Sequence, residues 1–335
     1  MPASKRISTF PLVRLNLARP FLNAADEAQG DVSEHLLQWG LNSEDFADDD
    51  RFVPATTMYE IVEMLGGLTG DAHAGVRLGE QLDPFSWRPL QLAVSESQTI
   101  AELLLRFSID AYREATSVTF NLTTKGERTT FSEERQVLPD VLPCHNDGFG
   151  AAYTLTILRE AVGEDWKGRE VIVEVSDPGV FPAGYHKIRL ARSDTRGFKV
   201  SFPTEWMLLE PKRKSIGTRR QPPVNLPVPS NQLDSLRVVL STYLADATLN
   251  NEGVARLCGV SSRTLARQLA EQETSVKREL DGLRSSVAKS LLSKDVLSIA
   301  EVGMRVGYPD PSVFSRTFKR WTGESPRDFR RRACS

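Results

Sequence analysis

The chain has 335 residues and a net charge of −2, and 40% of its residues are hydrophobic. This length allows two domains, each with its own core, and the composition is typical of a globular protein. No apolar run approaches the roughly 18 residues that a membrane-spanning helix needs, and the amino terminus has no continuous apolar stretch of the secretory kind. We therefore expect a cytoplasmic protein without membrane contact.

The residue types that carry catalysis and bind metals are scattered. The cysteines Cys144, Cys258 and Cys334 match no metal-ligand spacing, and the four histidines form no metal-binding motif. Cys144 and His145 are adjacent, but side chains of sequence neighbours rarely point toward each other. We therefore predict no enzyme activity, no metal and no cofactor.

Charge is distributed unevenly along the chain. The segment from Leu233 to Ser335 has 17 Lys/Arg and 12 Asp/Glu, whereas the remainder has 25 and 32. A basic segment joined to an acidic one suits a phosphate-facing domain beside a domain that avoids phosphate, although such imbalance is often only surface composition.

The first part of the chain alternates between helical and strand periodicity. Helices are predicted over 54–65, over 99–112 with Thr99 as the N-cap and Glu102 as its capping-box partner, and over 148–162. Strands are predicted over 118–122 and 128–131, which form a hairpin, and over 171–175 and 198–202. The pattern indicates an α+β domain over residues 1–209.

A linker and a helical domain follow. Residues 210–231 contain five prolines and a cluster of basic residues, which is typical of a semi-extended linker. Beyond it, apolar residues recur at helical spacing and no segment has strand periodicity. We therefore predict an all-α domain over 232–335.

Two segments of this all-α domain repeat one pattern, at about 252–273 and 299–322. In each, a small residue (Ala255, Gly303) precedes a glycine (Gly259, Gly307) by four positions, and a large apolar residue (Leu265, Phe314) follows. A helix-turn-helix requires this arrangement, because the two helices cross closely and the glycine adopts the left-handed conformation that ends the first helix.

The second helix of each segment is predicted to begin after an N-cap, Ser261 in one and Asp310 in the other. These helices would expose polar side chains that can bind base edges and phosphates. The alternative is a helical bundle with ordinary glycine-ended helices and solvated arginines, but the repetition of the pattern after 48 residues, from Gly259 to Gly307, favours a tandem helix-turn-helix.

The run from Ser298 to Pro326, together with Val260–Leu265 and the intervening Arg284, Ala288, Leu291 and Leu292, resembles the AraC/XylS family of bacterial transcription regulators. The resemblance covers about 233–332 and implies two recognition helices that enter the DNA major groove about one turn apart. By position it implies base contacts from Arg263, Ala266, Arg267, Pro311, Ser312, Ser315 and Arg316. With the neighbouring polar positions, the predicted DNA-binding residues are Ser261, Ser262, Arg263, Ala266, Arg267, Gln268, Pro311, Ser312, Ser315, Arg316, Lys319 and Arg320. Gly282, inside the helix expected between the two units, is unusual in the middle of a helix.

Residues from about 15 to 209 resemble more loosely the arabinose-binding-like sensor domain of one subgroup of this family. The resemblance rests on Gly75–Gly79, on Ser97–Glu102 and on the Phe202-Pro203 and Trp206 ending. It implies a small-molecule effector but not its identity. The candidate pocket residues are aromatic, and core packing is the alternative for each. They are Trp87, Phe107, Tyr112, Phe149 and Tyr153.

The resemblance implies an effector-controlled regulator, expected to be an activator, with double-stranded DNA as its partner. Homodimerisation and contact with RNA polymerase are further expectations. Two alternatives remain open from the sequence. One is a constitutive DNA-binding regulator whose first domain only dimerises; the other is an enzyme fused to a DNA-binding module, which the lack of a nucleophile arrangement disfavours.

Overall fold

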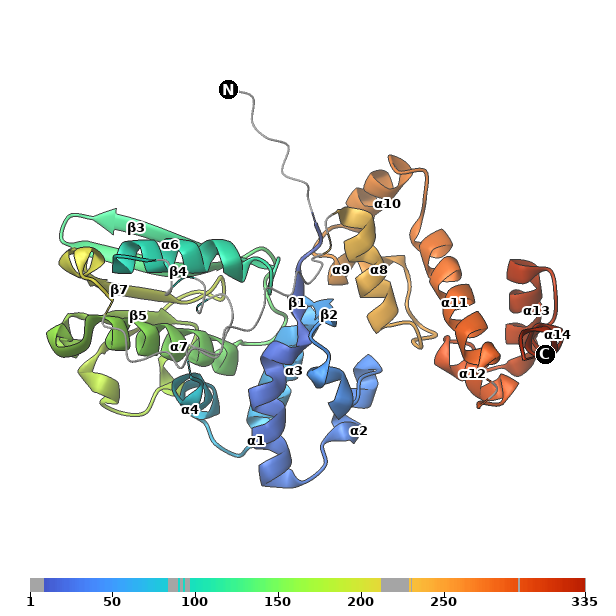
Figure 1. The fold of residues 1–335 in the computed structure, drawn as a ribbon, viewed down its shortest axis with the longest axis horizontal. Helices are drawn as coiled ribbons and strands as arrows, with labels where there is room; N and C mark the ends of the chain where they lie inside the picture. The colour runs from blue at the N-terminus through green and yellow to red at the C-terminus, as the bar shows by residue number, and fades with distance from the viewer. Residues whose placement is uncertain are drawn as a thin grey trace. The chain divides into compact units, whose positions relative to one another are not determined.

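The computed structural model describes residues 9–83, 90, 93, 97–211, 229, 231–294 and 296–334 (Figure 1). Contacts divide the chain into two compact units. The α+β unit comprises Pro11–Val32 and Ser43–Val228, and the helical unit comprises Met1–Phe10, Ser33–Asn42 and Pro229–Ser335. The predicted fold class, an α+β domain followed by an all-α domain, is confirmed.

The α+β unit has a five-stranded sheet in the order β3-β4-β7-β5-β6. Its strands are β3 Val118–Lys125, β4 Arg128–Arg135, β5 Ile172–Val175, β6 Arg189–Arg192 and β7 Lys199–Pro203. Among the described strands of this sheet, β5 and β6 pair in parallel and the other pairs are antiparallel. Strands β3 and β4 form the predicted hairpin, which turns at Gly126 with a φ of 58°. The predicted strands 171–175 and 198–202 correspond to β5 and β7.

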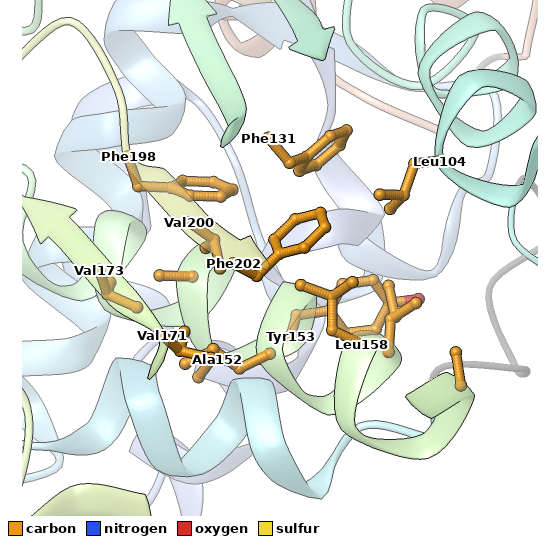
Figure 2. Close-up of a cluster of buried hydrophobic side chains, with 14 of the residues drawn as sticks. Leu104, Phe131, Ala152, Tyr153, Leu158, Val171, Val173, Phe198, Val200 and Phe202 are labelled. Atoms are coloured by element: carbon orange, nitrogen blue, oxygen red, sulfur yellow. The ribbon is translucent and has the colours of Figure 1, made fainter. Parts of the chain in front are cut away.

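One face of this sheet is apolar and the other polar. Phe131, Val200 and Val173 lie side by side in register and point toward the same face (Figure 2). Helices α6 (Ile100–Ala111) and α7 (Cys144–Val162) pack on that face, and their side chains complete one buried core. Thr130 and Ser201 share a register position on the opposite face, where their hydroxyls are hydrogen-bonded at 2.7 Å. This alternation is what a sheet covered on one side requires.

The remaining elements of the α+β unit are helices, short 3-10 turns and a two-stranded sheet. Helix α3 (Ala55–Leu68) buries Met58, Ile61, Val62 and Leu65, as predicted. The Thr99 hydroxyl caps α6 as predicted, and α7 begins four residues before the predicted start. The other elements are α1 Arg19–Gln29, α4 Ala74–Gln81 and the antiparallel pair β1 Leu12–Arg14 and β2 Phe52–Pro54. Short 3-10 turns are η1 Leu15–Ala18, η3 Ser43–Ala47, η5 Gly163–Asp165, η6 Gly168–Glu170, η7 Pro178–Val180, η8 Tyr185–Lys187 and η9 Thr204–Leu208.

The helical unit is organised around a central helix, α11 (Val276–Ser293). Figure 1 shows α9 and α10 near its amino-terminal end and α12, α13 and α14 at its carboxyl-terminal end. The bounds are α8 Gln232–Thr242, α9 Asn251–Leu257, α10 Ser262–Ala270, α12 Ile299–Arg305, α13 Pro311–Thr322 and α14 Pro326–Ala333. The segment Ser33–Asn42, with α2 Ser33–Leu36 and η2 Leu37–Trp39, groups with these helices although it was predicted within the first domain.

The linker prediction concerns residues 210–231. Residues 212–228 and 230 lie outside the described residues, so the linker and the exact boundaries of the domains stay predictions.

Candidate nucleic-acid interface

Helices α9 and α10 cross in the manner predicted for the first helix-turn-helix. Gly259 adopts a φ of 68° just after α9, and the Val260 N–H donates to the Ala255 carbonyl at 3.0 Å. Ala255 and Leu265 are each 1% exposed and fill the contact between the two helices. The Ser261 hydroxyl accepts from the Thr264 N–H at 3.2 Å and so caps α10.

Helices α12 and α13 form the second unit in the same way. Gly307 has a φ of 78°, and the Tyr308 N–H donates to the Gly303 carbonyl at 2.8 Å. A Cβ on Gly303 would lie 3.1 Å from the Tyr308 carbonyl oxygen and 3.2 Å from Cγ of Phe314, so a larger side chain would require these neighbours to shift. The Asp310 carboxylate accepts from the Ser312 and Val313 N–H groups, which holds its pKa below the usual value.

Arg284, on α11, joins the second unit to the segment that follows α8. Its guanidinium donates to the carbonyls of Leu244 and Asp246, and it lies over the Tyr308 ring at 5.3 Å from the centroid. A Cβ on Gly307 would lie 2.5 Å from Nη2 of Arg284. Glycine at this position therefore serves two purposes, the left-handed conformation and the space for Arg284.

The predicted contact residues on α10 form an exposed surface opposite the buried Leu265 and Leu269. Arg263 and Ala266 are exposed, and Arg267 forms an ion pair with Glu271 at 2.9 Å. Ser261 and Ser262, at the start of the helix, are exposed as well. Gln268 differs from the others because it is half-buried, and its Oε1 is enclosed without a hydrogen-bond partner among the described residues.

Helix α13 presents a more basic surface. Phe314 and Phe318 are fully buried on one side of it. The exposed positions are the predicted contact residues Pro311, Ser312, Arg316, Lys319 and Arg320, together with Val313. Ser315 is half-buried and its hydroxyl donates to the Pro311 carbonyl at 2.8 Å. Arg320 lies 3.6 Å from the Asp281 carboxylate on α11. Arg316 and Lys319 have no ion-pair partner in the part of the chain that the structure describes.

The five aromatic residues predicted for an effector pocket lie in different surroundings. Trp87 lies outside the described residues. Phe107 packs against Phe120 and Phe131 in the core, and Tyr112 is 42% exposed. Phe149 and Tyr153 stack on α7 with ring centroids 6.4 Å apart. The structure thus brings one pair of them together, and the pocket stays a prediction.

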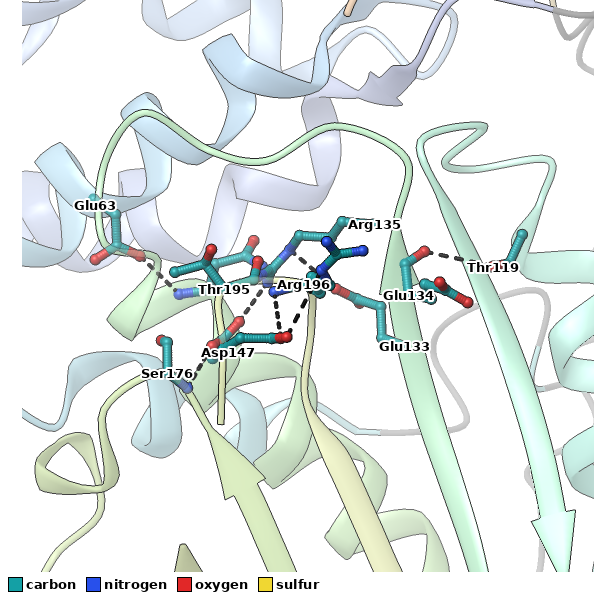
Figure 3. Close-up of polar contacts among 11 residues, drawn as sticks. Glu63, Thr119, Glu133, Glu134, Arg135, Asp147, Ser176, Thr195 and Arg196 are labelled. Carbon is teal, nitrogen blue, oxygen red and sulfur yellow. Dashed lines mark hydrogen bonds and ion pairs between the residues drawn. The ribbon is translucent and has the colours of Figure 1, made fainter. Parts of the chain in front are cut away.

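A cluster of buried charges in the α+β unit was not predicted (Figure 3). The Arg135 side chain is fully buried and pairs with the fully buried Asp147 and with Glu133. Burial raises the pKa of Glu133 to about 6. It also raises the pKa of Glu63, whose carboxylate accepts from the His145 and Asn146 N–H groups, to about 7. The alternation of β4 contained the signal, because Glu133 and Arg135 lie two and four residues beyond the inward-facing Phe131.

No group of three or more His, Cys, Asp or Glu that could hold a metal ion occurs among the described residues. Within the same residues, no helix is long and apolar enough to cross a membrane. Burial raises the pKa of the Cys144 thiol to about 11, which disfavours the thiolate that a nucleophile requires.

Each of the two units matches a family model of known proteins. Residues 254–332 match the family model described as a helix-turn-helix domain. Residues 30–188 match the model described as the arabinose-binding domain of AraC transcription regulator, N-term. In both units the chain is therefore similar to the AraC family of transcription regulators.

Its relatives match in limited regions. It is 46% identical over 70 residues to an uncharacterized HTH-type transcriptional regulator of Mycobacterium tuberculosis, which is 21% of this chain and 20% of the relative. It is 34% identical over 124 residues to the arabinose operon regulatory protein of Escherichia coli, covering 37% and 41%. It is 37% identical over 108 residues to the transcriptional activator RhaS of Escherichia coli, covering 32% and 38%. The matched regions thus span from a fifth to two fifths of these relatives.

Proposed function

We propose that this chain is an effector-controlled transcription activator of the AraC family that binds operator DNA through α10 and α13. The observation that carries the DNA part is the pair of capped helices whose apolar sides are buried in the helix-turn-helix crossings. Their opposite sides expose Arg263, Arg267 and Arg316. Arginine binds guanine edges bidentately and phosphates strongly, so these side chains suit both base reading and backbone contact.

The helix between the two units supports binding to successive major-groove segments. Helix α11 has 18 residues and is therefore about 27 Å long at 1.5 Å per residue. One turn of B-DNA is about 34 Å. Two units at opposite ends of such a helix are spaced on the scale of one DNA turn. Gly282 has nothing within 4 Å of where its Cβ would lie, so it does not shape the packing of α11.

Effector control is supported by the match of the first domain to an arabinose-binding domain model and by polar groups enclosed in that domain. An effector that binds one conformation or dimer better than another would shift the population, and with it the affinity for DNA. Activation is supported by the name of the relative RhaS, and homodimerisation and contact with RNA polymerase belong to the same proposal.

The test combines DNA selection with transcription. The full-length chain is used to select its operator from genomic fragments, and transcription from the bound promoters is then measured in vitro with RNA polymerase. We expect transcription to rise and to depend on a metabolite from a small-molecule library. Repression would refute the activator assignment. Operator binding and transcription that no metabolite changes would favour a constitutive regulator whose first domain only dimerises.

A further inference from the structure

The buried charge cluster of the α+β unit arises from the register of β4. Phe131 points into the core, and side chains two residues apart on a strand share a face, so Glu133 and Arg135 point inward as well. They lie opposite Phe120 and Val118 of β3. Two charged side chains thus occupy positions that the sheet pattern assigns to apolar residues. Buried polar residues at core positions destabilise a fold unless they are satisfied or functional.

The hydrogen bonds of the cluster hold both terminal nitrogens of Arg135 and leave other polar atoms around it without partners among the described residues. Arg135 donates through Nη2 to Asp147 and through Nη1 to the Thr195 carbonyl at 2.9 Å (Figure 3). The other carboxylate oxygen of Asp147 accepts from the Ser176 N–H at 2.9 Å. Nε of Arg135 lies 3.4 Å from Oε1 of Glu133 without forming a hydrogen bond. Both terminal nitrogens of Arg135 thus already bind acceptors of this domain, and its Nε–H faces Glu133.

The charges of the cluster do not balance. One guanidinium faces two carboxylates, those of Glu133 and Asp147, and a third carboxylate, Glu63, is close enough for its charge to interact with Arg135 and Asp147. Since the pKa of Glu133 is raised to only about 6, its carboxylate is mostly ionised at neutral pH. The enclosed cluster then has at least one excess negative charge, and an uncompensated charge in such surroundings is unfavourable.

Three enclosed oxygen atoms near Arg135 also lack partners. These are Oε1 of Glu133, Oη of Tyr59 and Oγ of Ser117, each without a hydrogen-bond partner among the described residues. Tyr59 is 3% exposed and its ring lies 5.0 Å from the Arg135 guanidinium, while Ser117 is fully buried just before β3. Arg135 and Ser117 are near enough to Oη of Tyr59 to oppose the rise in its pKa that burial causes. Glu133 and Tyr59 thus both lie beside the Arg135 guanidinium, and Ser117 lies beside Tyr59.

We propose that the effector site of this chain is the cluster of Glu133, Tyr59 and Ser117 beside Arg135, and that it binds a primary ammonium group. The inference rests on the proposed effector control and names its ligand class. An ammonium group has three N–H donors for the three unpartnered oxygens, and its charge offsets the excess negative charge. A water molecule could bind the oxygens but would leave the charge, and an anion would increase it. Such a ligand would connect β4 with α3 and with the start of β3.

The test measures binding of simple probes to the full-length chain at pH 7.5 and constant ionic strength. The probe is n-butylamine, and butyrate and n-butanol are the matched anionic and neutral controls. We expect only the amine to raise the melting temperature of the α+β unit in a saturable manner, and calorimetry to give its Kd. Saturable binding of butyrate, or no stabilisation by the amine, would overturn the proposal.

A pair of neighbouring variants tests the location. Glu133→Gln keeps the shape of the side chain, removes its charge and should weaken amine binding at least tenfold. Glu134→Gln, one residue along the strand and exposed on the other face, should leave it unchanged. Tyr59→Phe removes one acceptor and should weaken binding by a smaller factor, and circular dichroism checks that each variant folds. Equal binding by the Glu133 and Glu134 variants would overturn the site.

The same variants separate this inference from the proposed function. A library metabolite that changes operator affinity in the Glu133→Gln variant as in the parent chain would overturn the ammonium site and leave effector control standing. If that response is lost in Phe149→Leu, the effector site lies at the stacked aromatic pair instead. If the amine binds as expected but no ligand changes operator affinity, effector control fails while the site remains.

Discussion

Replacing Arg284 by methionine tests how the second helix-turn-helix is held in place. Methionine preserves most of the aliphatic volume of the buried side chain, which is 8% exposed, but removes every hydrogen bond. The carbonyls of Leu244 and Asp246 lose donors at 3.2 and 3.0 Å. A hydrogen bond to a charged group contributes about 1.5–3 kcal/mol, and rehydration of the freed carbonyls recovers part of that. We expect the free energy of unfolding of the helical unit to fall by about 2–4 kcal/mol.

The location of the effect is as informative as its size. Because Arg284 contacts the turn at Gly307 and the Tyr308 ring, its loss should loosen α12 and α13 more than α9 and α10. Hydrogen–deuterium exchange of the full-length chain should therefore accelerate in peptides from 299–322 and change little in those from 252–273. Arg284→Lys, which keeps the charge and can still donate to a carbonyl, should give an intermediate result. Unchanged stability together with uniform exchange in the methionine variant would refute the reasoning.

Three further predictions concern other parts of the chain. Arg316→Ala should weaken specific operator binding by about 1–3 kcal/mol in a titration at fixed salt, and unchanged affinity would remove α13 from the interface. Gly303→Leu should reduce stability by about 1–3 kcal/mol, since its side chain would clash with Phe314 at the crossing; calorimetry that shows normal melting would contradict this. Glu63 is protonated more readily in the folded state, because burial raises its pKa from 4.5 to about 7. Stability should therefore fall as the pH rises through this window, by up to about 1.4 kcal/mol per pH unit relative to Glu63→Gln, and parallel curves for the two proteins would exclude the shift.

The helix-turn-helix units could be predicted because their determinants are local. Ser261 and Asp310 cap helices within three residues of themselves, and Gly259 and Gly307 end helices by their own backbone conformation. The small residue and the apolar residue of each crossing lie within a dozen positions of one another. All of this information is contained in one short window of sequence.

The α+β unit was predicted less completely because its pairings are long-range. Strand β6, Arg189–Arg192, lacks a clear apolar alternation and forms only by pairing with β5. The first sheet joins Leu12–Arg14 to Phe52–Pro54, and three residues are too few for a periodic signal. Local patterns give no information about which distant strand a segment will pair with.

The buried charge cluster depends on both local and long-range determinants. Had the strand predicted over 128–131 been continued to Arg135, its alternation alone would have placed Glu133 and Arg135 on the inner face. Their partners could not have been found in this way, since Tyr59 and Asp147 come from two helices that meet the sheet only in the folded unit. The sequence therefore indicates two charged residues at inward-facing positions but not the residues that surround them.

The two recognition helices differ in the side chains that they offer to DNA. The ion pair of Arg267 on α10 has only a small influence on this difference. The pair of Arg267 with Glu271 lies on an exposed surface, where such pairs contribute about 0–1 kcal/mol, so Arg267 can exchange Glu271 for a phosphate at small cost. Ala266 has no polar group to exchange, and an alanine can read only an apolar feature such as a thymine methyl. On α13, Arg316 and Lys319 are exposed and basic. We therefore expect α13 to contribute more to affinity, and α10 to read fewer base positions through Arg263 and Arg267.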